Sequence, residues 1–167
     1  MTFDLQPVLR GERLFLRPLE RKDFADLHTA AADPLIWAQH PASNRYQRAV
    51  FQNFFDDAMA SGGALAAIDN ATGAMIGSSR FHGYDAEQNE VEIGWTFLAR
   101  RYWGGDYNGE MKALMLRHAF QFVKRVVFLV GPDNTRSQRA VEKIGGVKIG
   151  ERKNGDGLLS YVYAVSA

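Results

Sequence analysis

The chain has 167 residues, 46% hydrophobic and 23% charged, and this length and composition predict one globular domain over residues 1–167. A net charge of +1 argues against a nucleic-acid partner and against a polybasic membrane patch. The absence of cysteine excludes disulfides, thiol catalysis and thiolate metal sites. No apolar stretch approaches the ~20 residues of a membrane span and no signal-peptide pattern is seen, so we expect a cytoplasmic protein.

The first part of the chain alternates between strand and helix patterns. Asp23 is a favourable N-cap for a short helix, and Pro34 can open a further helical turn. Gly62–Gly63 would end a longer helix, and Asn70–Gly73 has the composition of a hairpin turn. We therefore expect, in chain order, a strand over residues 12–18, a helix after Asp23, a turn from Pro34 to Trp37, a helix over residues 45–61, strands over residues 64–69 and 74–81, and a polar connection over residues 83–89.

The central stretch, residues 91–122, predicts a strand, a glycine turn and a helix. Apolar and polar residues alternate at its start, which predicts a strand with Glu92 on the face opposite Val91, Ile93, Trp95 and Phe97. A glycine-rich turn over residues 101–106 follows. After it, helical spacing predicts one buried helix face with Tyr107, Met111, Leu114, Met115, His118, Ala119 and Phe122, so that His118 is expected to be a core histidine.

This strand, turn and helix indicate a site for an anion. The first N–H groups of a helix lack intrahelical partners and carry the positive end of the helix dipole. Glycines just before them let the backbone approach a phosphate closely. Glycines before a helix are also ordinary turn residues, and that alternative stays open on this pattern alone.

The last part of the chain predicts a buried strand, a helix and a closing hairpin. The apolar run within residues 125–131 suits a buried strand that is parallel to the strand before the helix. A helix over residues 135–144 would end at Gly145–Gly146, and strands over residues 147–152 and 158–164 would flank a turn at Asn154–Gly157. The whole pattern predicts an α/β or α+β domain with a mixed, mostly antiparallel sheet and helices on both faces.

Two motifs carry a resemblance to a known family. The first is Glu92-Ile93-Gly94-Trp95 followed by Tyr102-Trp103-Gly104-Gly105-Asp106-Tyr107-Asn108-Gly109-Glu110, and the second is Asn134-Thr135-Arg136-Ser137-Gln138-Arg139-Ala140-Val141-Glu142-Lys143-Ile144-Gly145. Together they resemble the GNAT superfamily of acyl-CoA-dependent N-acetyltransferases. The nearest branch is similar to the RimJ/RimL-type ribosomal-protein N-terminal acetyltransferases, and the resemblance extends from Leu14 to Ala164.

The resemblance implies how acetyl-CoA would bind. It implies a GNAT-like sheet of about seven strands in which a splayed parallel pair holds the acyl-CoA. The pyrophosphate would lie on the glycine turn, at Arg101, Gly104, Gly105, Asp106 and Asn108. The pantetheine arm would pair with the strand edge and contact two side chains of the second motif, which gives Trp95, Thr96, Phe97, Leu98, Asn134 and Ser137. An amide near Thr96 or Phe97 would polarise the thioester oxygen.

The resemblance also implies catalytic residues. An amine arrives as ammonium and must lose a proton before it attacks, and Glu92 is the candidate base. His82 is the rival base, and a surface or salt-bridged glutamate is the alternative interpretation of Glu92. In many relatives a tyrosine protonates the leaving thiolate. Val141 occupies the matching position here, and Ser137 is the nearest replacement.

Two further positions depart from the family pattern. Asp106 stands where the family has glycine or alanine, and its carboxylate would repel a pyrophosphate unless it points away or pairs with a cation such as Arg100 or Arg101. Gly146 stands where phenylalanine is usual. Asp106 and the missing tyrosine leave a second function open, that of a non-catalytic GNAT-like module that binds acyl-CoA or a small amine as a sensor.

The amine acceptor is left open by the sequence. Members of the branch acetylate protein N-termini and small-molecule amines, and a pocket for either is expected around Trp37, His40, Phe51, Phe55, His82 and Tyr84. No His/Asp/Glu spacing suggests a metal. A homodimer is compatible with the resemblance.

Overall fold

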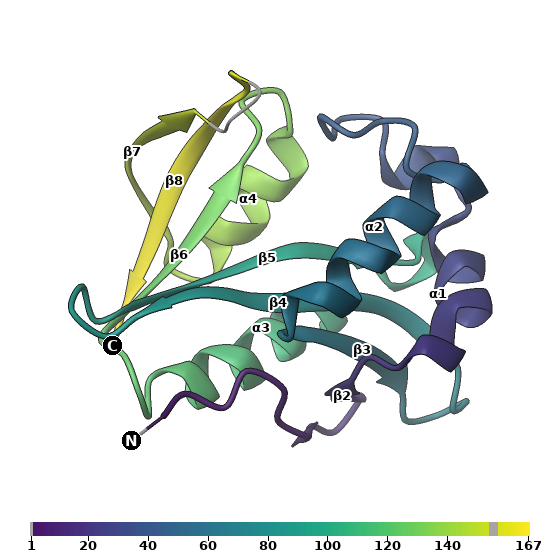
Figure 1. Ribbon diagram of the computed structural model, residues 1–167, viewed down its shortest axis with the longest axis horizontal. Helices are drawn as coiled ribbons and strands as arrows, with labels where there is room; N and C mark the ends of the chain where they lie inside the picture. The colour runs from purple at the N-terminus through teal and green to yellow at the C-terminus, as the bar shows by residue number, and fades with distance from the viewer. Residues whose placement is uncertain (1, 154–156) are drawn as a thin grey trace.

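The computed structural model describes residues 2–153 and 157–167 (Figure 1). The turn predicted at Asn154–Gly157 therefore lies outside the described residues except for Gly157. The strands are β1 (Leu9–Arg10), β2 (Leu14–Pro18), β3 (Ala64–Asp69), β4 (Met75–Asp85), β5 (Glu90–Leu98), β6 (Arg125–Val130), β7 (Val147–Lys153) and β8 (Leu159–Ser166). The helices are α1 (Phe24–Ala31), α2 (Arg48–Ser61), α3 (Tyr107–Ala119) and α4 (Thr135–Lys143), with short 3₁₀ helices at Arg21–Asp23, Pro34–Ile36 and Arg100–Tyr102.

The strands form one mixed sheet with the order β1-β2-β3-β4-β5-β6-β8-β7. Neighbouring strands are antiparallel except for β5 and β6, which are parallel and are joined through α3. The predicted class, a mostly antiparallel α/β sheet with one parallel pair, is confirmed. The described residues hold eight strands rather than about seven, because the two-residue β1 is too short to leave a periodic pattern in the sequence.

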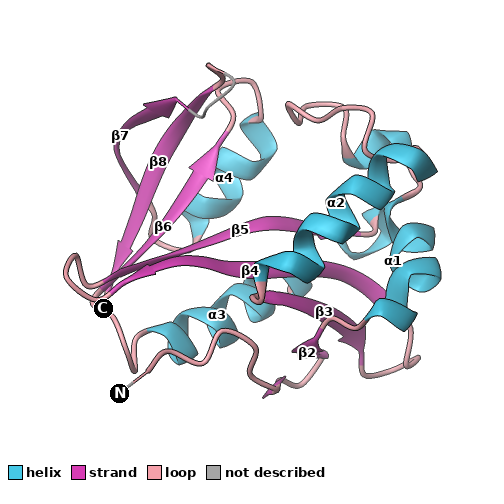
Figure 2. Cartoon of the chain, in the orientation of Figure 1, coloured by secondary structure: helices cyan, strands magenta, loops and turns pink. Residues whose placement is uncertain are grey.

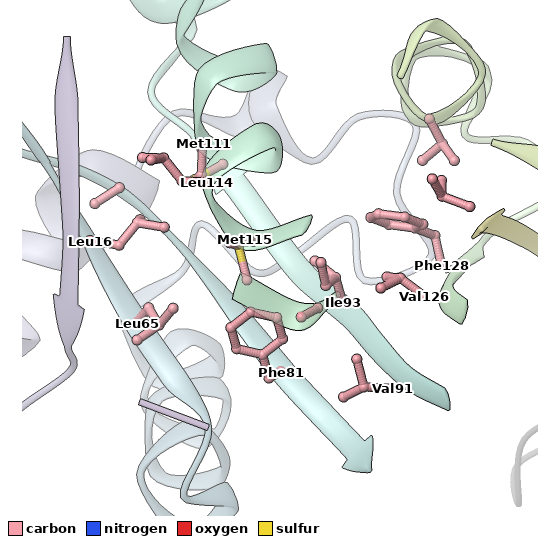
Figure 3. Close-up of a cluster of buried hydrophobic side chains, with 14 of the residues drawn as sticks. Leu16, Leu65, Phe81, Val91, Ile93, Met111, Leu114, Met115, Val126 and Phe128 are labelled. Carbon is pink, nitrogen blue, oxygen red and sulfur yellow. The ribbon is translucent and has the colours of Figure 1, made fainter. Parts of the chain in front are cut away.

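Helices cover both faces of the sheet (Figure 2). The α2 residues Phe51 and Phe55 belong to the cluster on one face, together with α1. On the other face α3 packs through Met111 and Met115, and Figure 3 shows them beside side chains of the sheet such as Phe81. The predicted buried face of α3 is confirmed as far as Ala119, where the helix ends.

His118 is a core histidine, as expected. It is 8% exposed and packs edge-on against Phe3, with ring centroids 5.5 Å apart. Its Nε2 lies 2.7 Å from the carbonyl oxygen of Asp4, so its polar atom has a partner. His118 is therefore held away from any site chemistry by its own packing.

The alternation predicted for β5 is wrong from Trp95 onward. Ser78 pairs with Phe97 and Arg80 pairs with Gly94, so Ser79 alone faces both Trp95 and Thr96. This is a β-bulge, and Trp95 takes a φ of 53° there. Each residue after the bulge points to the face opposite the one that a simple period of two predicts.

The bulge changes which side chains share a face. Val91 and Ile93 pack in the cluster on the α3 face, whereas Phe97 packs in the cluster on the α1 and α2 face. Glu92 alternates with Val91 and Ile93, so it lies on the same face as Phe97 and Trp95 rather than opposite the aromatic residues. A sequence period cannot reveal this, because the extra residue is fixed by the pairing with β4.

Smaller differences have local causes. The connection expected over residues 83–89 is shorter, because β4 runs on to Asp85, which pairs with Glu90, and residues 86–89 form the turn between them. Asp23 precedes α1 without capping it through its side chain, because its carboxylate accepts hydrogen bonds of 2.8 and 2.9 Å from Arg17. α2 begins at Arg48 rather than residue 45. Within the described residues, no helix is both long and apolar enough to cross a membrane.

Candidate active site

The parallel strands β5 and β6 pair over only three residues and then separate. Their ladder runs from Glu90 and Arg125 to Glu92 and Val127, although both strands continue beyond it (Figure 1). A cleft of about 500 Å³ opens where they part. The cleft brings together eight of the predicted site residues, namely Glu92, Trp95, Thr96, Phe97, Leu98, Asn108, Asn134 and Ser137.

The glycine turn is anchored at both ends on one buried carboxylate. Asp69, 2% exposed, accepts hydrogen bonds from the hydroxyl groups of Tyr107 at 2.8 Å and Tyr102 at 3.4 Å. Between them, Gly104 has a φ of 71°, which favours glycine. A Cβ atom added at Gly104 or Gly105 would meet no protein atom within 4 Å. The turn is thus a fixed, open cradle directly before the N-terminus of α3.

The charged residues of this turn are tied to the rest of the chain. Asp106 is exposed, and its Oδ2 lies 3.2 Å from Arg13 Nη2, so it pairs with a cation, which is one of the two arrangements that would relieve the repulsion. The expected partners were wrong, since Arg100 pairs with Asp33 and Arg101 stacks on a tyrosine ring. Arg13 comes from the turn before β2, so the sequence around Asp106 could not indicate this pairing.

Glu92 is a half-buried carboxylate at the point where the two strands part. A Cβ atom on Gly94 would come within 3.0 Å of Glu92 Oε2, so the glycine leaves room for this side chain. Burial raises the pKa of Glu92 from 4.5 to about 7, against the opposing effect of Arg152 and Arg80. In the described part of the chain Glu92 makes no salt bridge, which argues against the alternative interpretation that it is a salt-bridged glutamate.

His82 lies beside Glu92. The two residues are cross-strand partners on β4 and β5, and both line the cleft. His82 is exposed and its ring contacts Trp95 edge-on, with centroids 5.1 Å apart. Both candidate bases are therefore at the same place in the cleft.

The second motif covers the whole of α4, and Asn134 and Ser137 at its start line the cleft. Asn134 is 4% exposed, and its Oδ1 accepts a 3.4 Å hydrogen bond from the backbone N–H of Ser137. Two of the positions that depart from the family pattern, Val141 and Gly146, are in contact here. A Cβ atom on Gly146 would lie 2.4 Å from Val141 Cγ1, so the side chain of Val141 leaves no space for a larger residue at position 146.

Three cations on the cleft wall were missed by the sequence interpretation. Arg45, from the segment before α2, lies 4.6 Å above the Phe54 ring, and Arg136 lies 3.8 Å above the Trp103 ring. Lys112 reaches the cleft from α3. Lys112 lies four residues after Asn108, so the helix period places both residues on one face of α3. This spacing is the signal by which the sequence could have indicated Lys112.

Of the residues expected around an acceptor, two histidines line the cleft. They are His82 and His40, and burial followed by the charges of Arg45 and Arg136 lowers the pKa of His40 to about 4. The aromatic residues expected there are mainly core. Trp37, Phe51 and Phe55 are at most 2% exposed, and Tyr84 packs against Phe3 on the α3 side.

Comparison with known proteins decides the family. Residues 13–147 match the family described as Acetyltransferase (GNAT) domain. The chain belongs to the GNAT acetyltransferase family. It is therefore an N-acetyltransferase that takes its acetyl group from acetyl-CoA.

Solved structures of this GNAT protein's relatives agree on the fold. A GNAT-family acetyltransferase from Bacillus anthracis is 26% identical, with a TM-score of 0.77 over 96% of this chain and 98% of that one. A GCN5-related N-acetyltransferase from Brucella melitensis is 20% identical, with a TM-score of 0.84 over 96% and 79%. Mycobacterium smegmatis RimJ, solved with CoA-disulfide, is 20% identical, with a TM-score of 0.69 over 96% and 86%.

Proposed function

We propose that this GNAT protein transfers an acetyl group to a primary amine by direct attack in a ternary complex, with Glu92 as the base. The observation that carries the proposal is a desolvated carboxylate at the fork between β5 and β6. Because burial raises the pKa of Glu92 to about 7, this group can accept a proton near neutral pH. His82, its cross-strand partner, is the second candidate for the same step.

The residues around the cleft fit an acyl-CoA. Acetyl-CoA supplies the acetyl group as a reactive thioester. Backbone amides from Arg101 to Asn108 would hold the pyrophosphate, which the open Cβ positions of the turn support. The edge of β5 over residues 95–98, which lies beyond the ladder with β6, and the side chain of Asn134 would hold the pantetheine arm, with the Leu98 carbonyl already bonded to Trp103 Nε1. Thr96 lies beyond the last pair of the β5–β6 ladder, which supports an amide near it as the donor to the thioester oxygen.

The charges of the cleft favour an acceptor with a negative group near its amine. In the described part of the chain, Glu92 is the only acidic residue that lines the cleft, and Arg45, Lys112 and Arg136 line it as well. Arg45 is held on the rings of Phe54 and Trp37, and its guanidinium has no hydrogen bond or ion pair within residues 2–153 and 157–167. Such a cation would repel a polyamine and attract a carboxylate.

The finer classification belongs to the same proposal. We place the chain near the RimJ/RimL branch, with a peptide N-terminus or a small amine as acceptor, on the basis of its two motifs. We also propose that it acts in the cytoplasm, where acetyl-CoA is available, as a monomer or a homodimer. The alternative, a sensor that binds acyl-CoA without turnover, is weakened by Arg13, which balances the charge of Asp106.

Two measurements test the proposal. Coenzyme A at ~100 times its dissociation constant should stabilise the fold by ~2.7 kcal/mol, measured by thermal melts. Acetyl-CoA turnover is then followed over paired amines that differ only in a carboxylate. The absence of any thermal shift at millimolar coenzyme A would refute binding at the cleft. Binding without turnover of any amine would favour the sensor.

A further inference from the structure

A lysine that the proposed mechanism does not use lies inside the cleft. Lys112 is on α3, and only 5% of it is exposed. Its Nζ donates a hydrogen bond of 2.7 Å to Thr96 Oγ1, which lies 2.8 Å from Ser79 Oγ. In residues 2–153 and 157–167, no carboxylate forms an ion pair with this lysine.

The burial of the Lys112 ammonium group destabilises the folded protein. An ammonium taken out of water with only a neutral hydroxyl as partner is not compensated for its lost hydration. Burial accordingly lowers the pKa of Lys112 to about 7. A methionine would fill a similar volume without this cost, so packing does not explain the amine.

The position of Nζ suggests what the amine does. Thr96 is on β5 and Phe128 is on β6, where it is the first residue beyond the parallel ladder. Nζ lies 5.7 Å from the centre of the Phe128 ring. The amine therefore fills the fork between the diverging strands, next to the residue whose backbone we place at the thioester.

We propose that the ammonium group of Lys112 contacts the sulphur of acyl-CoA and gives its proton to the leaving thiolate. This inference rests on the proposed binding of acyl-CoA in the cleft. It places the proton donor on α3. In the second motif Val141 stands at the position of the family's tyrosine, and Ser137 is the nearest group that could donate.

The step balances with the groups already present. The amine nitrogen forms a bond to the carbonyl carbon, and the carbon–sulphur bond breaks with its electron pair going to sulphur. The ammonium proton of the substrate leaves through Glu92 to solvent before the attack. After the attack Glu92 takes the second proton from the nitrogen, and Lys112 Nζ gives a proton to sulphur. The products are an amide, the free thiol, a protonated carboxyl and a neutral amine. Transfer of one proton through solvent from Glu92 to Lys112 restores both groups.

The first test measures the thiol of bound coenzyme A and needs no acceptor. The thiolate absorbs in the ultraviolet, so its fraction can be titrated against pH in the complex. A cation within ~4–6 Å favours the thiolate. We expect ~10-fold more thiolate at a given pH with the unchanged protein than with Lys112→Met, which corresponds to one pKa unit. Lys124→Met, which removes an exposed lysine, should leave the titration unchanged.

The second test needs no substitution and therefore holds even if Lys112→Met does not fold. The titration of Lys112 is followed by NMR with coenzyme A and with desulfo-coenzyme A, which lacks the sulphur. We expect the pKa of Lys112 to be higher in the coenzyme A complex, because only that complex offers a thiolate. Equal values in the two complexes would overturn the contact.

Calorimetry of coenzyme A binding separates this inference from the proposed function. If the ligand binds but Lys112→Met leaves the thiol titration unchanged, Lys112 only supports Thr96 and the inference is wrong. If Ser137→Ala shifts the thiol titration and Lys112→Met does not, the group that contacts the sulphur is Ser137. An acetyl group found on Lys112 by mass spectrometry would make it an acyl acceptor rather than a proton donor. If coenzyme A does not bind at all, the proposed function itself fails.

Discussion

Replacement of Glu92 by glutamine should make the protein more stable at neutral and alkaline pH. Burial raises the pKa of Glu92 from 4.5 to about 7. Between these two values the folded protein holds a proton that the unfolded chain has lost, so stability falls as pH rises through this window. Each pKa unit is 1.36 kcal/mol, and the shift therefore corresponds to about 3 kcal/mol. Glu92→Gln removes this loss with little change of shape.

Urea denaturation at a series of pH values measures the effect. Above pH ~7 we expect Glu92→Gln to exceed the unchanged protein by up to about 3 kcal/mol, and below pH ~4.5 the difference should disappear. Glu87→Gln, at an exposed glutamate of the β4–β5 hairpin, is the matched control and should follow the unchanged protein throughout. Parallel curves for Glu92→Gln and the unchanged protein would show that Glu92 is not desolvated and would refute the argument.

The same variant should lose activity. General-base contributions typically amount to ~10²–10⁴-fold, and a loss of that order is expected once an acceptor is known. The limb of the pH–rate profile near pH 7 should also disappear, since it would report the ionisation of this carboxyl. Near-normal turnover in Glu92→Gln, together with none in His82→Ala, would move the role of base to His82.

Three further predictions follow from the site. Gly105→Ala should weaken coenzyme A binding at least ~10-fold by calorimetry, because the added Cβ atom has no protein atom within 4 Å beyond its chain neighbours and would clash only with a ligand. Gly109→Ala on the exposed side of α3 should not weaken it. Arg45→Met should raise the KM of a carboxylate-bearing acceptor ~10-fold or more and leave the KM of its uncharged analogue unchanged. Arg48 stacks on Phe24 outside the cleft, so Arg48→Met should change neither value. Tyr107→Phe should lower the urea concentration at which the protein unfolds, because the buried carboxylate of Asp69 loses its 2.8 Å partner. Equal urea curves for Tyr107→Phe and Tyr84→Phe would contradict this.

Much of the fold could be predicted from local pattern. The period of two marked most strands, and the spacing from Met111 to Ala119 gave the buried face of α3. The turn before α3 was visible as Gly104 and Gly105. The separation of β5 from β6 could not be predicted in this way, because no local sequence pattern encodes it. Only the resemblance of the two motifs to a known family implied it.

The candidate site was less accessible for identifiable physical reasons. The bulge at Trp95 depends on how β5 pairs with β4, so the strand's own sequence predicted the wrong face for Trp95 and Phe97 relative to Glu92. Arg45 reaches the cleft from an irregular segment, where periodicity gives no direction. Arg13 was missed as the partner of Asp106 because the two lie far apart in the chain.

Glu92 and Lys112 show why the bulge matters for the chemistry. Each has a pKa that burial brings to about 7, and each would carry the opposite charge of the other when ionised. In contact they would form an ion pair, which lowers the pKa of the carboxyl and raises that of the amine. Instead, burial raises the pKa of Glu92 with smaller effects of Arg152, Arg80 and Glu90, and burial lowers that of Lys112. The extra residue in β5 directs Thr96 toward Lys112 on the α3 face and leaves Glu92 on the other face, so that a base and an acid can remain apart until a substrate lies between them.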